Sequence, residues 1–124
     1  MGESNRQKKF SRLVQKELSE ILQMDVVVPG SPMLTVSVVR SSPDLGSCKI
    51  YISVFPDAQR TNALNWLREN EWDVRQKLAK RVRHQVKFVP EIHFFPDDSL
   101  EEVEHMEKLF DQIKKTEHRD QEEE

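Results

Sequence analysis

The sequence alternates between apolar and polar residues on both sides of a short turn, and this pattern constrains the fold more than any other feature. The turn, SSPDLGS, is rich in residues that favour tight turns. Alternation on both sides of such a turn predicts an antiparallel hairpin with one buried face. The residues expected on that face are Leu34, Val36 and Val38 before the turn and Cys48, Ile50, Ile52 and Val54 after it.

The opposite face of the predicted hairpin carries a mixture of polar and aromatic side chains. Tyr51 and Phe55 belong to this outward set, and they could contact a nucleic-acid base if the face is open. Cys48 lies on the apolar side. We therefore expect a small buried core residue there and not a reactive thiol.

A helix is predicted over residues 6–24, where apolar residues recur with helical spacing. Pro29, Gly30 and Pro32 follow it and cannot continue a helix. At 100° per residue the helix has an apolar face and an opposite basic stripe. The apolar residues are Phe10, Leu13, Val14, Leu18, Ile21 and Leu22, and the basic ones are Lys8, Lys9, Arg12 and Lys16.

A broken pair of helices is predicted between residues 58 and 87. Asn70 tolerates the left-handed conformation found at helix ends, and Asp73 is a suitable N-cap for the second helix. In that second helix Val74, Leu78 and Val82 form an apolar row. Arg75 lies within the apolar arc, which indicates a structural role. Lys77, Lys80, Arg83 and His84 project away from this row, and Arg81 flanks it.

A third strand is expected over residues 91–95, with Ile92 and Phe94 facing inward. We divide the chain into a flexible N-terminus (1–5), a folded domain (6–98), a C-terminal helix (99–115) that begins with the capping-box pattern Ser99-x-x-Glu102, and a disordered acidic tail (116–124). A three-stranded sheet must bury its apolar face, so we predict an α+β fold with helices packed on one face of the sheet.

No catalytic or metal-binding constellation stands out in the sequence. The four histidines lack the close spacing of a zinc site, and three isolated glycines cannot form a phosphate-binding loop. Asp97 and Asp98 precede a predicted helix, where the helix dipole alone favours acids. We therefore expect no enzymatic activity, cofactor or small-molecule substrate. A single cysteine and the lack of any apolar run near the ~20 residues of a membrane span favour a monomeric cytoplasmic protein without membrane contact.

The charge distribution favours a polyanionic partner. The chain has 19 basic and 22 acidic residues, yet residues 75–87 contain six basic residues and no acid, and residues 97–124 contain 12 acids against four bases. RNA binding needs cations that meet phosphates. The predicted RNA-binding residues are Lys8, Lys9, Arg12, Lys16, Lys77, Lys80, Arg81, Arg83 and Lys87. The alternative is a protein-interaction module that docks a partner through a sheet edge or the terminal helix.

Several local motifs, taken in order, resemble the bacterial ribosome-binding factor A family. They are Lys16-Glu17-Leu18 in the first helix, Thr35-Val36-Ser37-Val38, Ser42-Pro43-Asp44-Leu45, Lys49-Ile50-Tyr51-Ile52-Ser53, and the pair Arg75 to Ala79 and Val89 to Phe94. Each motif is weak alone, but their order and spacing agree with the family. Asn70-Glu71-Trp72 stands where the family has an Ala-x-Gly kink, and the segment before Pro90 is about two residues longer than the resemblance leads us to expect.

The resemblance implies a KH-like fold in the order α-β-β-α-α-β with one parallel strand pair, and it makes residues 6–98 an RNA-binding domain. It further implies an assembly factor that binds the immature 30S ribosomal subunit through its RNA. Such a factor promotes late maturation and processing of 16S ribosomal RNA and often matters in the cold.

Overall fold

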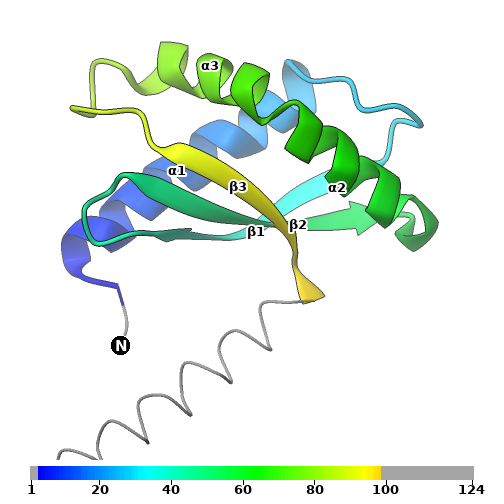
Figure 1. The fold of residues 1–124 in the computed structure, drawn as a ribbon, viewed down its shortest axis with the longest axis horizontal. Coiled ribbons are helices and arrows are strands. Elements are labelled where there is room, and N and C mark those ends of the chain that lie inside the picture. The colour runs from blue at the N-terminus through cyan, green and yellow to red at the C-terminus, as the bar shows by residue number, and fades with distance from the viewer. Residues whose placement is uncertain (1–2, 99–124) are drawn as a thin grey trace, which may run out of the picture.

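The computed structural model describes residues 3–98, so the expected C-terminal helix and acidic tail lie outside the described residues (Figure 1). The order of elements agrees with the prediction from the sequence. The elements are α1 (Asn5–Met24), β1 (Met33–Ser41), β2 (Ser47–Phe55), the short 3-10 helix η1 (Asp57–Gln59), α2 (Arg60–Glu69), α3 (Glu71–Val82) and β3 (Glu91–Pro96).

The strands form one sheet in the order β1-β2-β3, and the predicted α+β architecture is confirmed. β1 and β2 pair antiparallel across the turn, whereas β2 and β3 run parallel. A parallel pair needs a crossover connection, and α2 and α3 supply it. Figure 1 shows α1, α2 and α3 on the same side of the sheet, as predicted. The core lies between these helices and the sheet, where Leu18, Ile50 and Leu78 are fully buried.

β1 departs from simple alternation because it contains a bulge. The register shifts between Val36 and Val38, so Ser37 is left without a partner on β2. An extra residue in one strand reverses the facing of every residue after it. Val39 is therefore in the core with 4% of its surface exposed, and the expectation that Val38 faces inward is wrong. Val38 instead pairs with Tyr51.

The break between α2 and α3 is a single residue, Asn70. Its backbone is not left-handed, with φ −110° and ψ 18°, and it serves as the C-cap of α2 and the N-cap of α3. The prediction of a left-handed Asn70 followed by an N-cap at Asp73 is therefore wrong. The Asn70 side chain donates to the Trp66 carbonyl at 2.8 Å, and the Asn70 backbone N–H donates to the same carbonyl at 3.0 Å, so both groups close the last turn of α2. α3 then begins at once with Glu71.

Candidate nucleic-acid interface

The basic stripe of α1 is exposed along its whole length. Phe10, Val14 and Leu18 bury the inner face of α1 against the sheet. Because residues three and four apart share a face of a helix, this burial directs the basic side chains outward. Lys8, Lys9, Arg12 and Lys16 are all exposed. The structure thus places the four predicted cations of α1 together on its outer side.

The first turn of α1 is tied firmly to β1. Ser4 caps the helix in a capping box with Gln7. The Glu3 carboxylate accepts from the Ser11 hydroxyl at 2.9 Å and from the Ser41 backbone N–H at 2.6 Å. Of the residues 1–5 expected to be flexible, Glu3 accepts hydrogen bonds from neutral polar groups at the edge of the core and Ser4 caps the helix. The anchor fixes the direction of the basic stripe.

The second basic segment divides between a helix and a loop. α3 buries Val74, Leu78 and Val82 and ends at Val82, where the sequence suggested a helix extending toward Lys87. Lys80 is exposed and Lys77 half-buried on the helix. Arg83 and Lys87 are both exposed in the connection that follows, which we call the α3–β3 loop (residues 83–90).

Arg81 has a structural role that separates it from its basic neighbours. Its guanidinium donates to Glu20 at 2.6 Å, to Glu17 at 3.2 Å and to Asp25 at 3.2 Å, all at the C-terminal half of α1 or just after it. Hydrogen bonds to Glu17, Glu20 and Asp25 raise the pKa of Arg81 above its ordinary value. Arg81 therefore joins α3 to α1, and we leave it out of the candidate interface.

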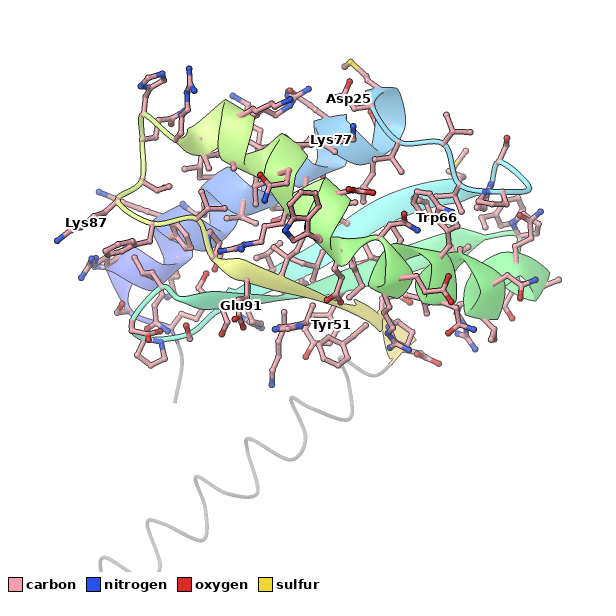
Figure 2. All side chains as sticks on the ribbon, turned by 45° about the horizontal axis from the view of Figure 1, so that its top comes forward. Asp25, Tyr51, Trp66, Lys77, Lys87 and Glu91 are labelled. Carbon is pink, nitrogen blue, oxygen red and sulfur yellow. The ribbon has the colours of Figure 1, made fainter. Side chains whose placement is uncertain are left out.

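The Arg81 contact joins the two helices that carry the basic segments. α1 and α3 pack against each other on the same side of the sheet. Arg81 offsets the negative charge of acidic residues of α1. These carboxylates therefore reduce the positive potential around the neighbouring cations less than they would alone. Figure 2 shows Lys77 on the upper side of the helix pair and Lys87 projecting from one end of the molecule. The candidate interface is thus formed by Lys8, Lys9, Arg12, Lys16, Lys77, Lys80, Arg83 and Lys87.

Arg75 confirms the structural role expected from its position in the apolar arc. Its Nε donates to the Pro90 carbonyl at 3.0 Å and its Nη2 to the Val89 carbonyl at 2.9 Å. A planar guanidinium suits two neighbouring acceptors of this kind. Arg75 therefore fixes the end of the α3–β3 loop where it enters β3.

The aromatic residues considered as base contacts differ in their exposure. Tyr51 is buried, with 1% of its surface exposed and its ring 5.8 Å from that of Phe95, so it is not accessible to a base. Trp66 is half-buried and packs against the core. Phe55 and Trp72 are exposed. Phe88, which no pattern in the sequence marks, is 71% exposed directly after the basic segment.

Residues 3–98 give little support for a metal site, a membrane-spanning helix or a reactive thiol. This part of the chain contains no group of three or more His, Cys, Asp or Glu residues arranged to hold a metal ion. Asp97 and Asp98 bind different partners, since Asp97 accepts from Ser37 and Asp98 pairs with Arg60. None of the described helices is both long enough and apolar enough to cross a membrane. Cys48 is buried, and desolvation raises the pKa of its thiol to about 11.

Comparison with known proteins agrees with this architecture. The sequence model of one family, ribosome-binding factor A, matches residues 6–110. The ribosome-binding factor A of Christiangramia forsetii is 38% identical over 110 residues, which cover 87% of this chain and 84% of that protein. The protein of the same name from Chlorobium luteolum is 36% identical over 113 residues, covering 90% and 94% of the two chains.

Solved structures of the same family share the fold. The crystal structure of ribosome-binding factor A from Thermus thermophilus superposes with a TM-score of 0.62 at 25% identity, covering 74% of this chain and 97% of that one. A homology model of the Thermus thermophilus factor, fitted into a cryo-electron-microscopy map of its complex with 30S, gives a TM-score of 0.59 at 29% identity and covers 68% and 88%. The arrangement of helices and strands described above is therefore the KH-like fold of these proteins.

Proposed function

Because the chain belongs to the ribosome-binding factor A family, we propose that it binds the small ribosomal subunit as an assembly factor. A relative with the same fold has been placed in a complex with 30S, and the curated relatives carry the name of a ribosome-binding factor. This family is not a known class of enzymes, and we assign no reaction to the chain. Its place of action on this proposal is the cytoplasm, where the subunits are assembled.

The observation that carries the proposal at the level of residues is the set of exposed cations on α1 and α3. Lys8, Lys9 and Arg12 on α1 and Lys80 on α3 are exposed on two helices that pack together. Within residues 3–98 these side chains make no described ion pair, so they are available to phosphates. Cations that meet phosphates release the counterions condensed on RNA, and this release favours binding. We propose that this surface contacts ribosomal RNA.

The finer role follows from the family resemblance. On the proposed function, binding occurs late in assembly and promotes the maturation and processing of 16S ribosomal RNA, including during growth in the cold. Accumulation of unprocessed 16S RNA in cells that lack the protein, more pronounced at low temperature, would support this role. Normal processing at all temperatures would contradict it.

Co-sedimentation with purified small and large ribosomal subunits over a range of salt tests the proposal directly. We expect selective binding to the small subunit that weakens as salt rises, with a steep log–log dependence set by the number of phosphates contacted. Equal binding to both subunits would indicate a general affinity for polyanions. Salt-insensitive binding would instead favour the protein-interaction alternative, in which an apolar surface meets a protein partner.

Two charge reversals locate the interface on one side of the molecule. Lys80→Glu changes an exposed lysine on α3, whereas Lys49→Glu changes an exposed lysine on the face of β2 opposite the core. We expect the first to weaken binding to the small subunit and the second to have a smaller effect. The triple variant Lys77→Glu, Lys80→Glu, Arg83→Glu should weaken binding further while the fold stays intact. Unchanged binding by the triple variant would remove α3 from the interface.

A further inference from the structure

The α3–β3 loop presents an exposed aromatic ring in a stretch without acidic residues. Phe88 is 71% exposed, and the Lys87 ammonium lies 5.6 Å from the centre of its ring. Residues 83–88 read RHQVKF, with two cations and no carboxylate. A large apolar ring left in water gains nothing for the fold. Its position next to cations suits a ligand that is both aromatic and anionic.

Both ends of this loop are fixed, so the position of the ring is defined. Val86 packs against the core, and its N–H donates to the Val82 carbonyl at 3.1 Å. Pro90 is buried, and the carbonyls of Val89 and Pro90 accept from Arg75. The residues on either side of Lys87 and Phe88 are thus held against the domain while these two side chains project from it. A ring presented on a fixed loop loses little conformational freedom when it binds.

We propose that Phe88 stacks on an unpaired base of RNA while Lys87 and Arg83 contact the phosphates beside that base. Single-stranded RNA is recognised by this combination of an aromatic face and neighbouring cations. Bases within a duplex are stacked on each other and are closed to a single protruding ring. This inference rests on the proposed function and adds to it the kind of RNA, an unpaired nucleotide, that the α3–β3 loop selects.

Other exposed rings among the described residues lack this setting. Trp72, 68% exposed, lies in the first turn of α3 between Glu71 and Asp73, whose charges repel phosphate. Phe55, 69% exposed, ends β2 and pairs with Met33, whereas β3 begins opposite Ser47 at the other end of β2. Figure 2 shows Lys87 projecting from the end of the molecule away from Trp66. Phe55 is therefore a matched control, equally exposed but remote from the loop.

Binding of the full chain to two RNA probes tests the inference. The probes are an unstructured single strand of about ten nucleotides and a duplex of the same length, at about 0.1 M salt. We expect Phe88→Ala to weaken single-strand binding about tenfold and to leave duplex binding within about twofold. Phe88→Tyr should bind like the native chain, because it keeps the aromatic face. Phe55→Ala should change neither affinity, and no variant should alter the salt dependence, because no charge is removed.

The possible results separate this inference from the proposed function. Equal losses on both probes with Phe88→Ala, or full binding by Phe88→Leu, would overturn stacking as the role of the ring. Unchanged binding by Phe88→Ala, with salt-dependent attachment to the small subunit retained, would overturn this inference alone. Absence of binding to both RNA probes and to the small subunit would overturn the proposed function together with it.

Discussion

At the scale of single residues, the neighbouring cations Lys80 and Arg81 of α3 have different roles. Arg81 binds Glu17, Glu20 and Asp25, while no hydrogen bond or ion pair of Lys80 is found among residues 3–98. Glu17 is the least exposed of the three acids, with 15% of its side chain accessible. Removing Arg81 leaves this carboxylate without its strongest partner. Truncating one member of a partly buried ionic cluster costs more than truncating a free surface cation.

We therefore expect Arg81→Met to lower the midpoint of thermal unfolding and Lys80→Met to leave it nearly unchanged. Both variants remove one positive charge from adjacent positions, so net charge is matched. In RNA binding the order should reverse, with the larger loss for Lys80→Met. Circular-dichroism melting and binding to the small subunit provide the two measurements. Equal melting temperatures for the two variants would contradict the structural role of Arg81.

The buried Cys48 thiol makes stability depend on pH in the alkaline range. Desolvation raises its pKa to about 11 from the ordinary value of 9.0. Well below pH 9 the thiol is protonated in both states and contributes no pH dependence. Between 9 and 11 the unfolded chain loses the proton while the folded chain keeps it, so the free energy of unfolding falls as pH rises. Hydrogen bonding to Ser41 opposes the shift but is the smaller cause.

Comparison with Cys48→Ala isolates this contribution from other groups that titrate at high pH. We expect the native chain to lose roughly 1 kcal/mol relative to the variant between about pH 8 and about pH 10. Urea unfolding at each pH measures the difference. A constant difference across that range would mean that water reaches the thiol in the folded state.

At the scale of elements, the bulge in β1 determines which valine enters the core. Val39 is 4% exposed and Val38 is half-buried on the opposite face. Replacing valine by threonine keeps the shape but adds a hydroxyl, which costs about 1–3 kcal/mol in a core without a hydrogen-bond partner. We expect Val39→Thr to be the more destabilising change and Val38→Thr to cost less. Urea unfolding measures the loss in free energy of unfolding for each variant. A larger loss for Val38→Thr would mean that β1 alternates without a bulge.

Local patterns predicted the elements well and their junctions poorly. The period-two runs and the apolar rows of the helices report burial over many residues, so the strands and helices of residues 3–98 were placed correctly. The bulge at Ser37 depends on pairing with β2, and no residue in VSVV marks it. The end of α3 at Val82 depends on how the next residues reach β3. The role of Arg81 depends on acids more than 50 positions away, which are neighbours only after folding.

The basic surface was more predictable than the contacts around it. Lys8, Lys9, Arg12 and Lys16 follow from helical periodicity alone, and the structure exposes all four. Their position relative to the cations of α3 depends on the packing of α1 on α3, which no local sequence pattern reveals. Phe88 was overlooked because a single aromatic residue shows no periodicity. Its signal was its position within an acid-free basic run next to a buried proline.

At the scale of the whole molecule, charge is separated along the chain. Residues 1–98 carry 15 basic and 12 acidic residues, a net charge of +3, whereas residues 99–124 carry four basic and ten acidic residues, a net charge of −6. Because the two parts are joined covalently, we expect the acidic residues to meet the basic surface at a high effective concentration. They should therefore compete with RNA for that surface, and the competition should be screened by salt.

Neutralising acids near the C-terminus tests this competition without deleting any residue. We expect Glu122→Gln, Glu123→Gln and Glu124→Gln together to tighten RNA binding severalfold at low salt and to lower the preference for the small over the large subunit. At about 1 M salt, where the Debye length is about 3 Å, the difference should vanish. Lys114→Gln with Lys115→Gln is the control of opposite sign, because it makes the same segment more acidic and should weaken binding. If neither set of changes alters RNA affinity at low salt, the acidic segment does not compete for the basic surface. Selectivity for the small subunit would then arise from the contacts of α1, α3 and the α3–β3 loop.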